Sequence, residues 1–232
     1  MRGGTGEHSV RMKIVFVEGN IGCGKTSLLK QIQAKFGACV QVVEEPVDLW
    51  EESGLLSSVY DGEVSRTTFQ FVALCTKTMA LLRGVRAASD AGAAPQRIVV
   101  AERSPFSDLH VFAEATIESE IDRAAYRVAH REMMSLLDDH TCSFLFLEHA
   151  PSELLVERIR KRCRDGEHHI DRAFLEDLDA RHADLKNTLA ASGYALQGLD
   201  CTRSPEAVFC GAKEFLEVQL GRRAGEPGGS LK

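Results

Sequence analysis

The sequence predicts an α/β fold in which a five-stranded parallel sheet is covered by helices on both faces. Short runs of β-branched and other apolar residues alternate along the chain with longer stretches of helical periodicity. Parallel strands need crossover connections, which are usually helices, so this alternation is typical of a buried parallel sheet. A chain of 232 residues with 44% hydrophobic residues is suited to one domain with a substantial core.

The expected elements follow from these patterns. Strands are expected at 13–17, 40–43, 98–101 and 142–147, with a weaker fifth candidate at 194–199. Helices are expected at 25–36, 67–88, 121–137, 151–164, 171–191 and 205–220. The Ala-, Gly- and Ser-rich stretch 88–96 is interpreted as a surface loop within the domain. One domain is therefore expected over 12–221, between a flexible N-terminus at 1–11 and a flexible tail at 222–232.

Composition and charge exclude several classes of function. The formal net charge of −6 is unlike that of a general nucleic-acid binder, so a small-molecule partner is favoured. No apolar run approaches the roughly 18 residues of a membrane span, and the first eleven residues lack the apolar region of a secretory signal. Seven cysteines occur without a CxxC pair, which indicates reduced thiols. A cytoplasmic protein with no membrane partner is expected.

The strongest motif is Gly19-Asn20-Ile21-Gly22-Cys23-Gly24-Lys25-Thr26, which fits GxxxxGK[ST] at every fixed position. An expected strand precedes it and an expected helix follows it, as this phosphate-binding loop requires. Its glycines let successive backbone N–H groups point at phosphate oxygens, and the helix N-terminus adds positive potential. Lys25 would neutralise the β/γ oxygens and the Thr26 hydroxyl would bind Mg²⁺. The motif predicts a P-loop NTPase-like fold that binds ATP and Mg²⁺, but it does not identify the phosphate acceptor.

Polar residues at the carboxyl ends of the expected strands narrow the choice, because ligands of open parallel sheets bind there. The guanine-reading NKxD of GTPases is absent. Glu148 follows the fourth strand, and an ATPase-type metal carboxylate there remains an alternative. Pro46 ends the second strand after Glu44 and Glu45, which must point to opposite faces, so one of them can serve as a base for a substrate hydroxyl. The alternative for these two residues is a solvated acidic turn.

Two further segments carry charges that a phosphotransferase could use. Glu102-Arg103 follows the third strand; the carboxylate could hold Mg²⁺, and the guanidinium could steady both Glu45 and the developing phosphoryl charge. A structural ion pair is the alternative. The segment 157–164 contains Arg158, Arg162 and Arg164 and is basic in an acidic chain. It could close over phosphates as a helical lid, at about 158–170, or be a solvated or nucleic-acid-binding face.

Together these segments resemble the cellular deoxynucleoside kinase family from about residue 13 to 174, with a looser match to the C-terminus. The motifs that carry the resemblance are Glu-Gly-Asn-Ile-Gly-x-Gly-Lys-Thr at 18–26, Glu-Pro-Val-x-x-Trp at 45–50, Phe-Gln at 69–70, Glu-Arg-Ser at 102–104, and the arginine-rich lid followed by Glu167. The resemblance implies transfer of a phosphoryl group from ATP to the 5′-hydroxyl of a deoxynucleoside. It also implies a homodimer that packs the long helices at 67–88 and 121–137.

The resemblance implies roles for individual residues. The catalytic residues would be Glu45 as general base, Arg103 as its partner, and Lys25. The ATP-binding residues would be those of the loop, Gly19 to Thr26, with Arg158, Arg162 and Arg164; the metal-side residues would be Thr26 and Glu102. The substrate-binding residues would be Gln70 on the base edge, Phe112 stacked on the base, Trp50 and Ile21 as walls, and Tyr60 with Glu167 on the 3′-hydroxyl. The planar amide of a glutamine offers one acceptor and one donor, which suits a nucleobase edge.

The preferred nucleobase depends on Lys77 and Asp108. These positions resemble an Arg–Asp pair in the branch that accepts cytidine and purines, whereas the thymidine branch is apolar or small there. Lys77 keeps the charge but replaces a guanidinium fork by an ammonium. We therefore expect a deoxycytidine- and purine-leaning or broad pocket, with thymidine as the alternative because a lysine stem can fold aside. A nucleoside-monophosphate kinase and a non-catalytic ATP-binding regulator are the more distant alternatives.

Overall fold

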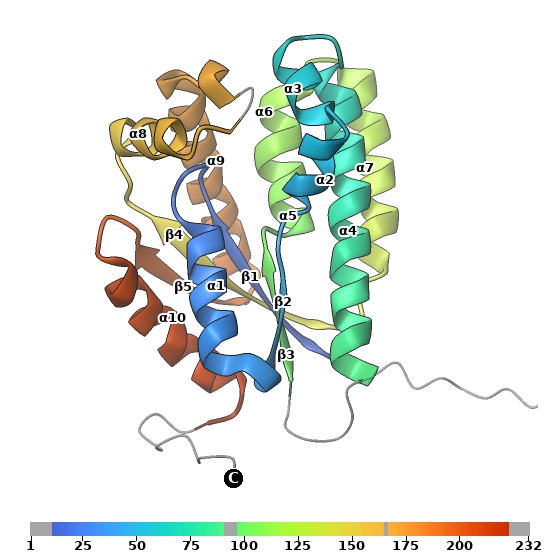
Figure 1. The fold of residues 1–232 in the computed structure, drawn as a ribbon. Coiled ribbons are helices and arrows are strands. Elements are labelled where there is room, and N and C mark those ends of the chain that lie inside the picture. The colour runs from blue at the N-terminus through green and yellow to red at the C-terminus, as the bar shows by residue number, and fades with distance from the viewer. Residues whose placement is uncertain (1–10, 91–96, 165–166, 223–232) are drawn as a thin grey trace, which may run out of the picture.

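The computed structural model describes residues 11–90, 97–164 and 167–222 and confirms the α/β fold (Figure 1). The five strands are β1 (Lys13–Gly19), β2 (Val40–Val43), β3 (Ile98–Glu102), β4 (Thr141–Glu148) and β5 (Ala195–Asp200). All pair in parallel in the order β2-β3-β1-β4-β5, so β1 lies at the centre. The expected weak fifth strand is present, at the edge of the sheet.

The long helices lie where the sequence predicts them, with ends that differ by a few residues. They are α1 (Lys25–Phe36), α4 (Arg66–Asp90), α7 (Glu120–Ser135), α8 (Ser152–Arg162), α9 (Arg172–Ala191) and α10 (Pro205–Gln219). α8 ends two residues before the predicted end because Cys163 adopts a left-handed conformation with φ 50°. α4 continues to Asp90, and the rest of the expected loop at 88–96 lies largely outside the described residues.

Several short helices were not predicted. Two of them, α2 (Val47–Glu52) and α3 (Leu55–Tyr60), follow β2, and a third helical stretch follows β3. That stretch consists of α5 (Pro105–Ser107), a π-helix (Asp108–Ala113) and α6 (Glu114–Thr116). Ser104 caps it and Pro105 occupies its first position, which is a helix-start pattern in the sequence. Single 3-10 turns occur at Gly37–Cys39 and Glu167–His169.

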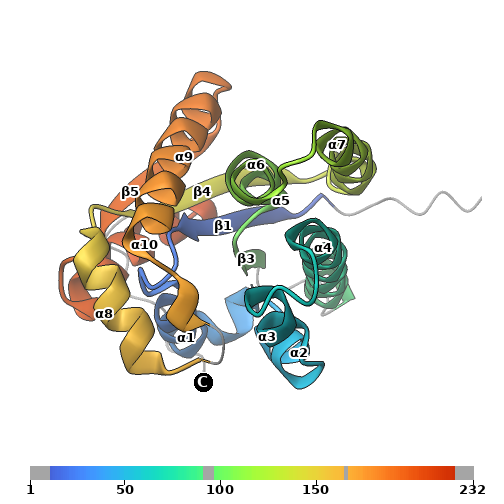
Figure 2. The ribbon, with the colours of Figure 1, turned by 90° about the horizontal axis from the view of Figure 1, so that it is seen from above.

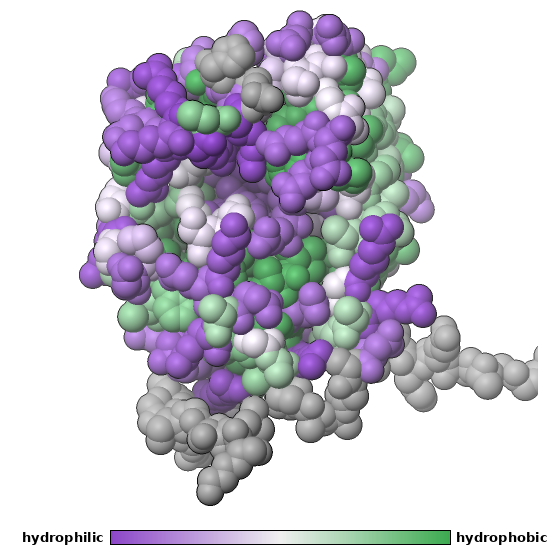
Figure 3. Space-filling view, viewed as in Figure 1, coloured by the Kyte–Doolittle hydropathy of each residue, from purple (hydrophilic) through white to green (hydrophobic). Residues whose placement is uncertain are grey.

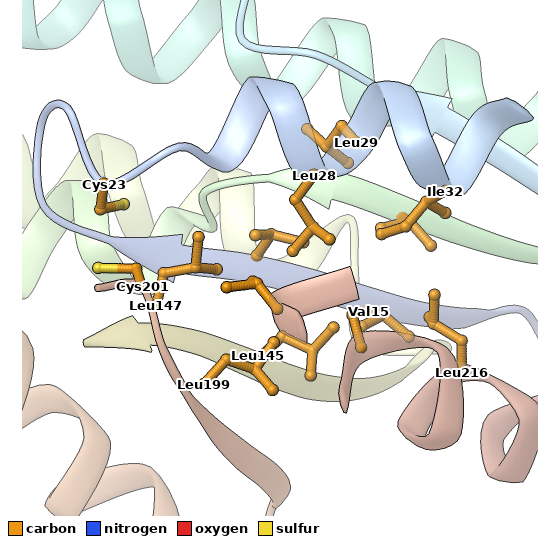
Figure 4. Packing of buried hydrophobic residues seen from close by; sticks show 14 of the residues in the cluster. Val15, Cys23, Leu28, Leu29, Ile32, Leu145, Leu147, Leu199, Cys201 and Leu216 are labelled. Carbon is orange, nitrogen blue, oxygen red and sulfur yellow. The ribbon is translucent and has the colours of Figure 1, made fainter. Parts of the chain in front are cut away.

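Strand alternation divides the core between the two faces of the sheet. Val15 and Val17 of β1 pack with residues of α1, α8 and α10, whereas Ile14 and Phe16 pack with residues of α4 and α9. Figure 4 shows the first of these clusters, in which Leu28 and Ile32 of α1 lie over the sheet. Burial on both faces explains why the central strands are continuously apolar.

The segments 1–11 and 222–232, which flank the predicted domain, lie almost entirely outside the described residues, so their predicted flexibility stays a prediction. Within the described residues, no helix combines the length and the apolar character that crossing a bilayer requires.

The close approach of α4 to β2 generates a stability prediction. A Cβ at Gly84 of α4 would overlap Cγ2 of Val43. Gly84→Ala should therefore lower the free energy of unfolding by about 1–3 kcal/mol, although alanine favours a helix more than glycine does. Urea unfolding followed by circular dichroism measures this change. Val43→Ala in the Gly84→Ala background should restore part of the loss, and a single variant as stable as the wild type would contradict the packing argument.

Candidate active site

The polar residues singled out in the sequence gather at the carboxyl edge of the sheet. Parallel register places Val17 of β1 beside Glu102 of β3, and Val43 of β2 beside Ala101. The loop that follows β1, the Glu45 segment that follows β2 and Arg103 after β3 therefore emerge side by side. α8 lies on one side of this edge, and α2 and α3 lie on the other (Figures 1 and 2).

The loop between β1 and α1 has the backbone geometry that its glycines allow. Gly22 and Gly24 have φ of 82° and 99°, in the region that side chains disfavour. The Lys25 ammonium is buried and donates to the carbonyls of Gly19 (3.3 Å) and Asn20 (3.0 Å), so it curls back over the loop. Burial and the nearby Arg103 lower the pKa of Lys25. The loop and the helix N-terminus form an anion cradle.

Thr26 and Glu102 provide a set of oxygens suited to Mg²⁺. The Thr26 hydroxyl donates to the Glu102 carboxylate, with oxygen–oxygen distances of 3.1 and 3.2 Å, and Lys25 Nζ lies 4.0 Å from the same carboxylate. Hydroxyl, carboxylate and phosphate oxygens are the ligands that Mg²⁺ takes in phosphotransferases. The residues at this position therefore fit the metal that the sequence predicts.

Glu45 lies between two cations. Its Oε1 is 3.4 Å from Lys77 Nζ, and its Oε2 is 3.4 Å from Arg103 Nε. Burial alone would raise the pKa of Glu45, but the charges of Lys77, Arg103 and Lys25 outweigh it and lower this pKa to about 2. Glu45 is thus ionised at neutral pH, as a proton acceptor must be. Glu44 points away and is exposed, as strand alternation predicts.

Arg103 joins the strand ends. Its Nη1 donates to the carbonyl of Gly19 at 2.9 Å, and its backbone N–H donates to Val17 O at 2.9 Å. The guanidinium carbon lies 4.5 Å from the ring centroid of Phe112. Arg103 has φ 62°, a conformation that costs free energy in a non-glycine residue and that often occurs at functional sites.

The Lys77 ammonium also forms an ion pair with Asp108, as the resemblance leads us to expect. Burial lowers the pKa of Lys77, but Asp108 and Glu45 raise it more, so the ammonium stays protonated. Asp108 begins the π-helix, and its Oδ2 is buried without a hydrogen-bond partner in the described part of the chain. π-Helical turns are rare and are often found at functional sites.

The predicted nucleoside-binding residues lie beside these charges. Gln70 of α4 is buried, and its side-chain amide forms no hydrogen bond within residues 11–90, 97–164 and 167–222. The indole of Trp50 donates to the Thr76 hydroxyl at 3.1 Å and packs edge-on against Phe69. The Phe112 ring is 5.9 Å from Lys77 Nζ. An aromatic ring and a buried amide without a protein partner can receive a planar base.

Two of the three lid arginines are engaged by carboxylates. Arg162 forms a two-pronged contact with Glu167, and Arg164 contacts Glu51 of α2 at 2.6 Å and Glu167 at 3.5 Å. Arg158 instead donates to Cys201 O at 3.1 Å.

Burial and then the Glu167 charge raise the pKa of Tyr60 to about 12. The two residues of the predicted sugar-binding pair therefore lie within electrostatic range of each other.

The end of α8 and the segment formed by α2 and α3 border an open cavity of about 410 Å³. It is lined by Glu51, Leu56, Ser57, Arg162, Cys163 and Arg164. Figure 3 shows hydrophilic residues around the recess between the two sides of the molecule.

Three contacts at the site were not predicted. Glu18 continues β1 and is fully buried; it accepts a hydrogen bond from Ser104, and burial raises its pKa. A carboxylate directly after an apolar strand is the sequence pattern that could have indicated its burial. No local sequence pattern indicates the contact of Glu51 with Arg164, because the two residues lie far apart in the sequence. The Lys77–Glu45 contact was also missed.

The alternative site at Glu148 has a different partner. Its oxygens accept hydrogen bonds from Lys186 of α9 at 2.7 and 2.8 Å. Glu148 also crowds Gly198 of the edge strand β5, where an added Cβ would overlap Oε1. This pairing accounts for Glu148 without a metal.

The fold, the phosphate loop and the adjacent carboxylates define a P-loop phosphotransferase as the class of this protein. A family model described as "Deoxynucleoside kinase" matches residues 15–210. The chain therefore belongs to the deoxynucleoside kinase family, and it is a phosphotransferase that acts on a deoxynucleoside.

Individual relatives differ in the activity that their names state. Deoxycytidine kinase 2 of Gallus gallus is 28% identical over 74% of this chain and 73% of the relative. Deoxycytidine kinase of Rattus norvegicus is 28% identical over 92% of this chain and 95% of the relative. Thymidine kinase of Ictalurid herpesvirus 1 is 29% identical over 86% of this chain and 84% of the relative. These names leave the preferred base of the chain open.

Proposed function

We propose that the enzyme transfers the γ-phosphoryl group of ATP, bound with Mg²⁺, to the 5′-hydroxyl of a deoxynucleoside. The observation that carries the proposal is the position of Glu45, an ionised carboxylate at a strand end beside the phosphate loop. Glu45 accepts the hydroxyl proton while Lys25 and the loop amides hold the phosphates. Thr26 and Glu102 would hold Mg²⁺, which would supply positive charge to neutralise the phosphates.

The other predicted residues complete this mechanism. Arg103 lies between Glu45 and the carbonyl of Gly19 and would stabilise charge on the transferring group. Arg158, Arg162 and Arg164 would close on the phosphates, with the loop residues Gly19 to Thr26 beneath. Gln70, Phe112 and Trp50 would bind the base, and Tyr60 and Glu167 the 3′-hydroxyl. Positioning and charge neutralisation would supply most of the rate.

The charges near the acceptor position disfavour a nucleoside-monophosphate kinase. Such an enzyme needs a cationic site for the acceptor's own phosphate, whereas the predicted acceptor position carries the carboxylates Glu45 and Glu167. The carboxylates Glu45 and Glu167 would repel a second anion.

Lys77 and Asp108 favour a base pocket that prefers deoxycytidine and purine deoxynucleosides or that accepts a broad range of bases. The unpartnered Oδ2 of Asp108 is a hydrogen-bond acceptor, and the exocyclic amino groups of cytosine and adenine are donors. Thymine presents a carbonyl at the equivalent position, which would leave that oxygen unpaired. A thymidine kinase remains the second candidate, since one relative is named so.

A cytoplasmic homodimer is the proposed form of the enzyme. α4 and α7 pack side by side and carry exposed apolar side chains, among them Met79, Ile121 and Val128. All seven cysteines are free, as in proteins of reducing compartments.

The first prediction about function tests Glu45 as the general base. Glu45→Gln keeps the shape of the side chain but removes its ability to take a proton, so kcat for phosphoryl transfer should fall at least about 100-fold. ATP binding, measured by calorimetry, should persist because Glu45 does not form the phosphate loop. Radiolabelled transfer from ATP gives the rate. A variant as active as the wild type would refute the assignment, and a wild type that binds ATP without transfer would indicate a regulator.

The second prediction concerns the nucleobase. Among the four deoxynucleosides, deoxycytidine or deoxyadenosine should have a kcat/KM about tenfold or more above that of thymidine. Asp108→Ala should reduce this ratio, because the acceptor for the amino group is lost. Exclusive turnover of thymidine would contradict the argument from the ion pair and favour the second candidate.

The third prediction concerns assembly. Sedimentation at micromolar concentration should give twice the chain mass, and Met79→Glu with Val128→Glu should give the chain mass, because buried unpaired carboxylates oppose the interface. A wild type of single chain mass would contradict the proposed dimer. Leu49→Glu, an exposed apolar position on α2, is the matched control and should remain dimeric.

A further inference from the structure

One ammonium group connects the base pocket to the predicted catalytic carboxylate. Lys77 lies seven residues after Gln70 on α4, which places both side chains on the same face two turns apart. Its Nζ forms an ion pair with Asp108 and lies 3.4 Å from Glu45 Oε1. The side chains of Lys77 and Asp108 are 9% and 3% exposed, so water screens these contacts little.

We propose that Lys77 is a positioning residue for the catalytic base: it holds Oε1 of Glu45 while Asp108, in the nucleobase pocket, holds Lys77. The proposal rests on the proposed function of Glu45 as the proton acceptor. It assigns to Lys77 a part in phosphoryl transfer in addition to a part in base recognition.

The division of the Glu45 carboxylate between two cations supports this role. Arg103 contacts Oε2 and Lys77 contacts Oε1, so the plane of the carboxylate is fixed from both sides. A general base must present one lone pair to the substrate hydroxyl within hydrogen-bond reach, and small errors of position are costly. Arg103 alone would leave the carboxylate free to rotate about its last torsion angle.

The chemistry of lysine suits a shared contact. An ammonium has three donors on one atom and can serve two carboxylates at once. A guanidinium at the same position would favour a two-pronged contact with Asp108, and its planar fork would leave fewer donors for Glu45. This chain has Lys77 where the branch that accepts cytidine and purines has an arginine. The replacement therefore changes which groups the cation can reach.

The charged groups around Glu45 also support a role for Lys77 in holding its carboxylate. The charged groups facing it are Lys77 of α4, Arg103 after β3, Lys25 of α1 and Asp108 of the π-helix, with the Tyr60 hydroxyl of α3 further out. Glu44 precedes Glu45 after β2, and Glu102 ends the adjacent strand β3. Burial raises the pKa of Glu45, and Lys77 makes the largest contribution that lowers it. Loss of Lys77 must therefore raise the pKa of Glu45.

The sign of the pH effect follows. Glu45 accepts a proton only when ionised, so activity is lost as pH falls through its pKa. A higher pKa moves the acid limb of the kcat/KM profile to higher pH. A lysine whose ammonium does not act on Glu45 would leave the acid limb in place.

The test uses the full chain with saturating Mg²⁺·ATP and whichever deoxynucleoside the wild type turns over, from pH 5 to 9. The informative variant is Lys77→Met with Asp108→Ala, which removes the ion pair without leaving an unpaired buried charge. Asp108→Ala alone is the matched control, since it makes the same change in the base pocket but retains the Lys77–Glu45 contact. Circular dichroism checks that both variants are folded.

We expect kcat at pH 8 to fall about tenfold in the double variant relative to Asp108→Ala, with little change in the KM for ATP. We also expect the ratio of kcat/KM at pH 5 to that at pH 8 to be lower in the double variant than in Asp108→Ala. Lys77→Arg should keep the acid limb close to that of the wild type, because the positive charge remains.

Coincident pH profiles for the double variant and Asp108→Ala would overturn the proposal for Lys77. That outcome differs from failure of the proposed function, which full activity of Glu45→Gln would reveal. If Glu45→Gln is inactive and the two profiles coincide, Glu45 remains the base and Lys77 has no part in holding it.

Discussion

The guanidinium of Arg103 is the contact on which the geometry of the site depends. It links the end of β1, through Gly19 O, to Glu45 after β2, while its own backbone is bonded to Val17 O. Three strand ends are thereby held at fixed spacing around one cation. The left-handed backbone of Arg103 is a cost that these contacts offset. Without this link the phosphate loop and the predicted base would be connected only through the sheet.

Burying so many charges in one place requires that they compensate one another. Lys25, Arg103, Glu18 and Asp108 are buried, and the side chains of Lys77 and Glu45 are only 9% and 17% exposed. Isolated ions in this environment would be strongly destabilising, whereas pairs with hydrogen bonds are tolerated. Burial raises the pKa of both Glu18 and Asp108, and Glu18 also accepts a hydrogen bond from the Ser104 hydroxyl. A neutral Glu18 would reduce the repulsion among the three carboxylates.

The sequence was sufficient for the features that depend on local pattern. The strands, the long helices and the phosphate loop follow from periodicity and glycine spacing, and parallel topology brings Glu45, Glu102 and Arg103 to one edge. The short helices α2 and α3 were missed because six residues carry too little periodicity. The contacts of Lys77 with Glu45 and of Glu51 with Arg164 join segments separated by more than 30 residues. Such contacts depend on side-chain reach in the folded chain, which no local pattern records.

The shared position of Lys77 has a consequence for selectivity. Consider a pocket in which one ion pair recognises the nucleobase and a separate cation holds the catalytic carboxylate. In such a pocket the preferred nucleobase can change without a loss of kcat. Here Lys77 contacts both carboxylates, so a substrate that draws Asp108 toward its amino group also changes what Lys77 offers to Glu45. In the proposed mechanism, binding energy from the nucleobase would then orient Glu45, which would favour correct substrates in kcat as well as in KM.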